Sequence, residues 1–377
     1  MRRAPNRIFS VILVATALFA SAQAASVWKS DAVTWQFRSW YPQYSRVFSS
    51  VLRDSCQEPY AAYQRGWVDN DKIDVLGGGD EHSALIQPVI LCLLDNTSEY
   101  IKSAMSSAQV LLGVTPTILA YMGPTAQELS LLSVVAKRPF LSFCLSLGSP
   151  GMHLTRAFQY NDPAKLFEDQ AGSFQPVVRG NRIRFIAAGQ YLAAFIALAN
   201  IGHLYYELSV QTVSAIWPDN FIGPLLWGAF AAAFHFSSLW LLMLRMRRAE
   251  YSLREGEVRR QRASILSRIR AWWRLEWQVS AHQNKIYIVV YPESTQFVVL
   301  WWVVSICMVG HLVYGTILLS SMFFIGPRDA LVIIARFMIS ALMSRLIIAY
   351  EVAGLRMNYT ELVVKYTRAE PRVVYDV

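Results

Sequence analysis

Apolar residues gather into long runs separated by polar stretches, and the lengths of these runs set the expected architecture. A helix needs about 20 residues to cross a bilayer, and four of the runs reach that length. A fifth run is weaker, because polar residues interrupt it and Thr115-Pro116 should kink a helix there. We predict helical spans at 105–123, 183–204, 221–244, 297–323 and 330–350.

Three shorter segments are predicted not to cross. Lys137-Arg138-Pro139 interrupts an apolar stretch, so residues 139–152 are predicted to enter the membrane and return, as a re-entrant segment. Residues 85–94 are too short for a span, contain Pro88 and predict a buried or interfacial helix. Residues 286–291 predict either a short strand or an extended lead into the fourth span.

The first residues have the pattern of a secretory signal peptide. Three arginines precede the apolar stretch 8–20, and Ala22-Gln23-Ala24 is typical of a cleavage site. The apolar stretch is short for a span, and the arginines hold its start in the cytosol whether or not it is cleaved. Residues from 25 onward are therefore expected outside the cytosol, as a small region rich in aromatic residues.

Charge then orients the spans. The chain is 54% apolar and 16% charged, which is typical of a membrane protein, and its net charge is +9. Eleven Lys and Arg residues against four Glu lie within residues 245–285, between the third and fourth spans. Such a basic loop marks the cytoplasmic side. We therefore read the positive charge as membrane topology rather than as a nucleic-acid site.

The predicted fold is an all-α membrane protein with about five transmembrane helices, a re-entrant segment and a small extracytoplasmic N-terminal region. We expect a multi-pass protein of the secretory pathway or plasma membrane with a cytoplasmic C-terminus. The predicted segments are a signal peptide (1–24), the extracytoplasmic region (25–104), the first span with the re-entrant segment (105–154), a cytoplasmic loop (155–182), a hairpin of two spans (183–244), the basic amphipathic loop (245–296), a second hairpin (297–350) and a cytoplasmic tail (351–377).

Four short sequence words lie close together in the first half of the chain. They are LLGVTPTILAYMGPT at 111–125, ELSLLS at 128–133, KRPFLSF at 137–143 and LGSPG at 147–151. In these words, over about residues 105–151, the chain resembles a family of uncharacterised integral membrane proteins of filamentous fungi. The resemblance implies a multi-span membrane protein, and it implies no particular activity or catalytic residue.

Polar residues inside predicted spans are candidates for a functional site. His203, His235 and His311 lie at three different depths, so a shared metal or haem site is not expected, and His203 is placed to share a helix face with Glu207. Arg336 and Arg345 fall on opposite faces of the last span. For both arginines, snorkelling or structural pairing competes with a role in a substrate path.

The basic loop also contains an amphipathic helical pattern over 258–279. Its tryptophans, Trp272, Trp273 and Trp277, fall within one arc with other apolar residues, while most arginines, including Arg268 and Arg270, lie elsewhere. This pattern favours a helix that lies on the inner leaflet and binds anionic lipid. A calmodulin-type target helix and packing against residues 155–182 are the alternatives.

Two cysteines and two sequons test the predicted topology. Cys56 and Cys92 both precede the first span, on the oxidising side, and are predicted to form a disulfide; two buried thiols are the alternative. Asn96, in Asn96-Thr97-Ser98, is a predicted glycosylation site, whereas Asn358 should face the cytosol and remain unmodified.

The sequence contains no motif of a known catalytic or cofactor site. We find no Ser/His/Asp set, no paired carboxylates at one depth and no HExxH, so we expect no enzyme, no metal and no cofactor. The favoured function is a structural, regulatory or interaction role, with the lipid bilayer as the partner and no nucleic acid. The alternative is a small-solute transporter or channel, against which stands the lack of an inverted repeat.

Overall fold

The computed structural model describes residues 35–66, 85–151, 182–218, 221–249, 265–283, 286–362, 364–367 and 370–373. The predicted signal peptide lies outside these residues. So do nearly all of the polar loop 155–182 and residues 258–264 of the predicted basic helix.

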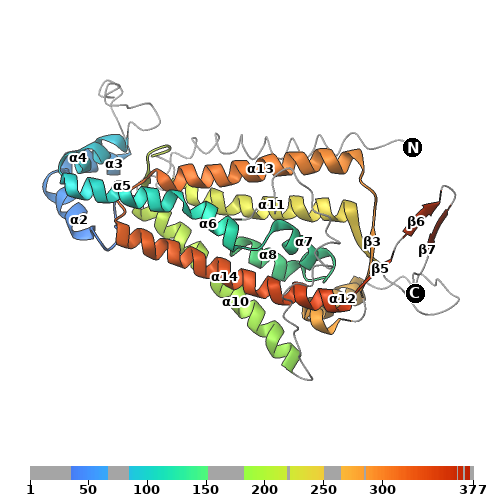
Figure 1. Cartoon of the computed structure of the whole chain (residues 1–377). Helices are drawn as coiled ribbons and strands as arrows, with labels where there is room; N and C mark the ends of the chain where they lie inside the picture. The colour runs from blue at the N-terminus through green and yellow to red at the C-terminus, as the bar shows by residue number, and fades with distance from the viewer. Residues whose placement is uncertain are drawn as a thin grey trace.

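Helices dominate the described part of the chain, and they run side by side as a bundle (Figure 1). Within the described residues, five helical segments are long and apolar enough to cross a membrane, which confirms the predicted number of spans. They are α5 (Glu99–Gly113) with α6 (Thr115–Met122), α10 (Arg182–Gln211), α11 (Gly223–Arg245), α13 (Thr295–Ser320) and α14 (Pro327–Asn358).

The first of these segments is broken where the sequence predicted a kink. Helix α5 ends at Gly113, and α6 begins at Thr115 with a proline in its first turn. Proline lacks a backbone N–H, so it suits the first turn of a new helix and interrupts an existing one. Helix α6 ends in turn at Met122, before Gly123 and Pro124.

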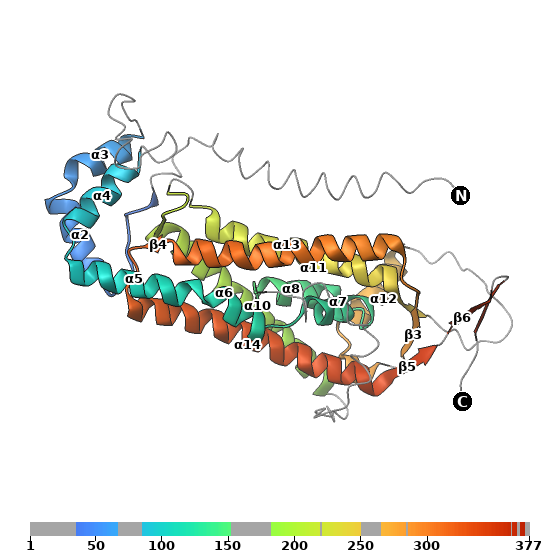
Figure 2. The same ribbon diagram turned by 45° about the horizontal axis from the view of Figure 1, so that its top comes forward.

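Two short helices, α7 (Ala126–Val134) and α8 (Pro139–Leu147), follow inside the bundle. Figure 1 and Figure 2 place both helices between α11 and α14. The first eight residues of α7 are buried. A capping box starts α7, because the Thr125 hydroxyl accepts the Glu128 N–H and the Glu128 carboxylate accepts the Thr125 N–H. Helix α8 starts at Pro139, after Lys137 has turned the chain with a φ of 59°.

One end of the bundle carries a small helical cap. The cap consists of α2 (Ser45–Asp54), α3 (Gln57–Arg65) and α4 (Gln87–Asp95). Its core is aromatic, and Phe324, from the connection between α13 and α14, packs its ring against Phe37, Trp40 and Phe48. A two-residue pairing of β1 (Val213–Ser214) with β4 (Met322–Phe323) lies beside the cap. We call this end of the bundle the disulfide end.

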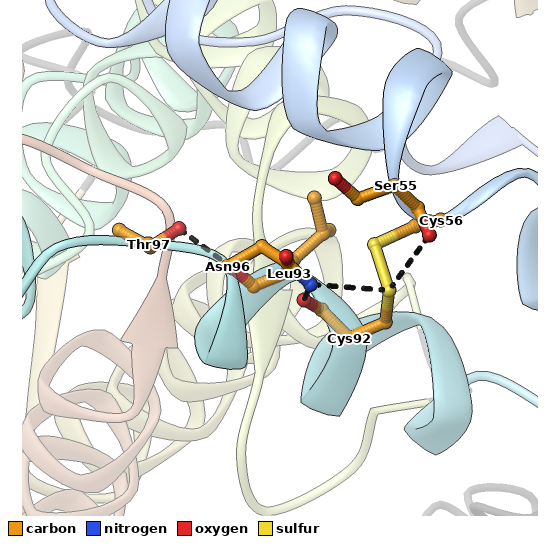
Figure 3. The surroundings of a disulfide bond; sticks show 6 residues. All are labelled: Ser55, Cys56, Cys92, Leu93, Asn96 and Thr97. Carbon is orange, nitrogen blue, oxygen red and sulfur yellow. Dashed lines mark hydrogen bonds between the residues drawn. A yellow bond between two sulfur atoms is a disulfide. The ribbon is translucent and has the colours of Figure 1, made fainter.

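The cap contains the predicted disulfide. Cys56 and Cys92 are bonded, with their Cα atoms 5.9 Å apart, so α3 is held against α4 (Figure 3). Asn96 caps the end of α4 and is exposed, and its side-chain amide donates a 2.9 Å hydrogen bond to the Cys92 carbonyl. The prediction of two separate buried thiols is therefore excluded.

The opposite end, which we call the α12 end, holds a short helix and a three-stranded sheet. The helix α12 (Ile265–Glu276) leads through the 3₁₀ turn η4 (Ser280–His282) into β3 (Ile286–Val290), which confirms the strand alternative for this segment. In the sheet, β3 lies between antiparallel β2 (Met246–Ala249) and parallel β5 (Tyr359–Leu362). Strands β6 (Val364–Thr367) and β7 (Glu370–Val373) pair separately.

The last span is longer than predicted. We expected it to end at Tyr350, but α14 continues to Asn358, and residues 351–355 are buried. The hydropathy pattern stops at the charged Glu351, whereas the helix continues because Arg138 neutralises that charge inside the bundle. Gly354 allows this turn to meet η4, since a Cβ there would lie 2.5 Å from the Ala281 nitrogen.

Candidate functional site

Three helix ends meet inside the bundle, where α6 ends, α7 begins and α8 ends. We call residues 122–126 together with 147–151 the central break. The two chain segments are in direct contact. A Cβ on Gly123 would lie 2.6 Å from the Ser149 hydroxyl oxygen, and a Cβ on Gly151 would lie 2.6 Å from the Cβ of Leu119, in α6. Small residues are therefore required on both sides of the contact, because any larger side chain would separate the strands.

Arg345 reaches the central break from α14. Its guanidinium pairs with the carboxylate of Glu128, the residue that also completes the capping box of α7. The Arg345 side chain is 40% exposed and that of Glu128 is 11% exposed. Pairing with a carboxylate on another helix therefore accounts for this intramembrane arginine, as one of the sequence alternatives predicted.

His311 contacts the central break from α13. Its Nε2 lies 3.0 Å from the Pro150 carbonyl oxygen, and its ring stacks on Trp227 at a centroid distance of 5.8 Å. The three span histidines do not come together: His235 is buried elsewhere beside Phe143, and His203 is exposed towards the disulfide end. Among the described residues, no three potential metal ligands form a group.

Several buried polar atoms inside the bundle have no hydrogen-bond partner in the described part of the structure. They include the hydroxyls of Ser133, Ser149, Ser238 and Ser344 and the Nδ1 atoms of His235 and His311. Burying an unpaired polar group in the membrane interior costs roughly several kcal/mol of free energy, because no bulk water replaces the missing partner. These atoms therefore fit a bundle that holds water or the polar groups of a bound molecule.

A small pocket opens beside α7, on the side that faces α11 and α13. One of the partnerless hydroxyls, that of Ser238, belongs to its wall. The lining residues are Gln127, Ser130, Ser238, Leu241, Leu242, Phe297 and Trp301.

Arg336 lies in a second polar cluster, nearer the disulfide end. Its guanidinium pairs with Glu207, donates a 3.0 Å hydrogen bond to the Asn200 side-chain oxygen and lies 3.1 Å from His203 Nδ1. The predicted contact of His203 with Glu207 is present at 3.4 Å. Burial, reinforced by the Glu207 carboxylate, raises the pKa of the nearby Tyr41 phenol, which therefore remains protonated at neutral pH.

The strongest ionic cluster is at the α12 end, and it was not among the predicted candidates. Arg138, at the start of α8, pairs with Glu351 of α14 at 2.8 Å, and both side chains are completely buried. Gln190 of α10 bridges them, accepting from Arg138 and donating to Glu351, both at 2.6 Å. The hydroxyl and N–H of Ser280 in η4 donate to the second oxygen of Glu351.

The same cluster fastens α12 to the bundle through Glu276. This buried carboxylate accepts the Leu141 N–H at 3.0 Å and the Tyr191 hydroxyl, while its backbone carbonyl accepts from Arg138 at 2.8 Å. The sequence signal for it was present as three charged residues next to apolar stretches, at positions 138, 276 and 351. Only the fold shows that they share one site.

The three tryptophans predicted for the lipid-facing side of the basic helix are exposed. Trp272, Trp273 and Trp277 are 37%, 46% and 44% exposed, and the Arg270 side chain beside them is also exposed. Arg268 belongs to the same helix. Trp277 also lies against Tyr191, at a ring-centroid distance of 4.9 Å, so the helix rests on the bundle while keeping an open aromatic face.

The chain matches no protein-family model, no curated protein and no solved structure.

Proposed function

We propose that the protein binds a small polar solute and moves it across a membrane through the region around the central break. The observation that carries the proposal is that α6, α7 and α8 all begin or end inside the bundle. Helix ends inside a membrane bring backbone N–H and C=O groups to its interior, and transporters use such ends as binding sites. In this reading α8 belongs to the predicted re-entrant segment 139–152, and α7, which was not part of that prediction, precedes it inside the bundle.

The partnerless polar atoms support the same function. Ser149, Ser344 and His311 contribute three of them around the end of α8, and Ser133 and Ser238 contribute others on α7 and α11. A purely structural bundle gains nothing from leaving such groups unsatisfied, whereas a hydrated path requires polar atoms that are free to contact water and solute.

We place the disulfide end outside the cytosol and the α12 end, with the C-terminus, inside it. The described residues of the basic stretch, 245–249 and 265–283, belong to the α12 end, and a disulfide persists on the oxidising side. We also propose that the fungal-family resemblance reflects kinship, and that the protein has no catalytic site.

Cysteine labelling tests the path. In a background with Cys144 and Cys307 replaced by alanine, single cysteines are placed at Ser149, Ser238 and Ser344 and treated with a membrane-impermeant methanethiosulfonate in native membranes. We expect labelling, since each position lies on the hydrated path. Cysteines at Ile339 and Leu346, which are 58% and 62% exposed in the middle of α14, are matched controls on the outer surface of the bundle and should remain unlabelled. If the reagent, added from either side of the membrane, labels none of the three interior cysteines, transport is refuted.

A regulatory role of α12 at the membrane surface is the second candidate, and the exposed tryptophans beside Arg270 favour it. Tryptophan prefers the membrane interface, and each arginine near an anionic surface contributes about 1 kcal/mol. Because Glu276 joins α12 to α8 and α10, lipid binding by α12 would be transmitted to the bundle.

Hydrogen exchange of the whole protein in nanodiscs tests the α12 proposal. Phosphatidylserine should slow exchange across residues 265–276 relative to phosphatidylcholine, and high salt should remove the difference. The variant Arg270→Glu with Arg274→Glu should abolish the effect, while Arg53→Glu, on the exposed surface of the cap, should not alter it. Equal protection in the two lipids would exclude recognition of anionic lipid.

A further inference from the structure

Helices α6 and α8 both end at the central break, so two carbonyl ends of helices face one region. Helix α6 ends at Met122 and α8 at Leu147, and the contact between Gly123 and Ser149 joins the two ends. The last carbonyl groups of a helix lack partners within that helix and carry the negative end of its dipole. The start of α7 is already capped by the Thr125 hydroxyl and the Glu128 carboxylate, so the two carbonyl ends favour a cation as the ligand.

Two buried hydroxyl groups without partners lie beside the end of α8. Ser149 and Ser344 are both 0% exposed, and neither hydroxyl oxygen has a hydrogen-bond partner. A Cβ on Gly123 would lie 2.6 Å from the Ser149 oxygen, and one on Gly148 would lie 3.3 Å from the Ser344 oxygen. Ser149 therefore follows Gly148, the C-cap of α8, and the Ser344 hydroxyl of α14 lies beside Gly148.

We propose that Ser149, Ser344 and the carbonyl ends of α6 and α8 form a binding site for a monovalent metal cation such as Na⁺. A hydroxyl oxygen offers two lone pairs, and hydroxyl and carbonyl oxygens are suitable ligands for hard cations. Divalent Ca²⁺ and Mg²⁺ sites draw on carboxylates, whereas Glu128, the carboxylate at the start of α7, is already paired with Arg345. Neutral oxygens therefore select a single positive charge.

The charged and titratable neighbours are consistent with this assignment. Arg345 and Glu128 neutralise each other, so the pair adds no net repulsion, and the His311 Nε2 is engaged with Pro150. The inference deepens the proposed transport function, because a cation bound beside the helix ends would be the ion coupled to solute movement.

Cation-dependent stability tests the site in the full-length protein purified in detergent. The melting temperature is measured while NaCl replaces N-methyl-D-glucamine chloride at constant ionic strength. A ligand that binds only the folded state raises stability with the logarithm of its concentration once the site is saturated. We expect Na⁺ to raise the melting temperature with this logarithmic dependence, and the dissociation constant fitted from it to be at least tenfold higher in the double variant Ser149→Ala with Ser344→Ala. Ser344→Ala alone, measured as well in case the double variant does not fold, should weaken binding at least threefold.

Ser107→Ala is the matched control, because this hydroxyl is exposed on α5 and donates to the Ser103 carbonyl at 3.1 Å. It should bind Na⁺ like the unchanged protein. No stabilisation specific to the cation, or equal binding by the Ser344→Ala variant, would overturn the site. A path labelled by methanethiosulfonate without Na⁺ stabilisation would refute the cation site alone. If Na⁺ stabilises the protein but the interior cysteines are not labelled, transport is refuted and the cation site is still supported.

Discussion

Replacing Glu351 by glutamine is the sharpest test of the ionic cluster at the α12 end. The change keeps the shape of the side chain but leaves Arg138, which is 0% exposed, without its 2.8 Å carboxylate partner. Two unit charges about 4 Å apart interact by about 4 kcal/mol at an effective dielectric constant of 20. Removing one partner of a buried ion pair costs about 3–5 kcal/mol in measured cases. We therefore expect the free energy of unfolding to fall by about 3–5 kcal/mol.

The assay is denaturant unfolding of the purified protein in detergent, followed by tryptophan fluorescence. Glu99→Gln is the matched control, since Glu99 also has a cationic partner at 2.8 Å, Lys102, but its side chain is 89% exposed. An exposed pair contributes about 0–1 kcal/mol, so this control should be nearly neutral.

The double variant Arg138→Gln with Glu351→Gln completes the test. The double variant removes both members of the ion pair and leaves Glu276 held by the Leu141 N–H and the Tyr191 hydroxyl, so it should be more stable than the sum of the single losses predicts, by about 1–3 kcal/mol. A loss below about 1 kcal/mol in Glu351→Gln, equal to that of the exposed control, would refute the reasoning. It would mean that Arg138 finds another partner or reaches water when the carboxylate is removed.

Three further predictions concern the cap, the topology and one helix start. Reduction of the disulfide, or Cys56→Ser, should lower the free energy of unfolding of the cap by about 3–4 kcal/mol, the value that the chain-entropy model gives for two cysteines 36 residues apart. The loss is measured as faster proteolysis of the cap, and an unchanged rate of proteolysis would contradict the prediction. Asn96→Gln should remove a glycan, seen as an electrophoretic shift, whereas a glycan on Asn358 would reverse the proposed topology. Ser294→Ala should cost about 1 kcal/mol in unfolding experiments, because its hydroxyl caps α13 by accepting the Phe297 N–H at 3.2 Å; Ser50→Ala, on exposed α2, should cost less.

Those parts of the fold that depend on local patterns were predictable from the sequence. The five apolar helices follow from the length of the apolar runs, and the break before α6 follows from Thr115-Pro116. The disulfide between Cys56 and Cys92 followed from their common place before the first span. Each of these features is decided by residues close in sequence or by the membrane itself, so no knowledge of tertiary contacts was needed.

The ionic clusters were not predictable in the same way, because a charge inside an apolar bundle depends on a partner from a distant segment. Arg336 was expected to snorkel or pair, but its contacts with Asn200 and Glu207 depend on how α10 crosses α14. Glu276 lies within the predicted amphipathic helix 258–279 and was not a candidate, yet it is buried against α8 and α10. Hydropathy therefore located the spans and missed the residues that hold them together.

The contact between Glu128 and Arg345 also has a consequence for the order of biosynthesis. The two residues are 217 positions apart, and translation at about 5–20 residues per second separates their synthesis by roughly 10–40 s. During that interval the Glu128 carboxylate has no counter-charge, because Arg345 and the rest of α14 have not yet been synthesised. The same holds for Arg138 at the start of α8, whose partner Glu351 lies near the end of α14. A chain truncated before α14 therefore lacks the partners of both Glu128 and Arg138, and it contains uncompensated charge among its apolar helices.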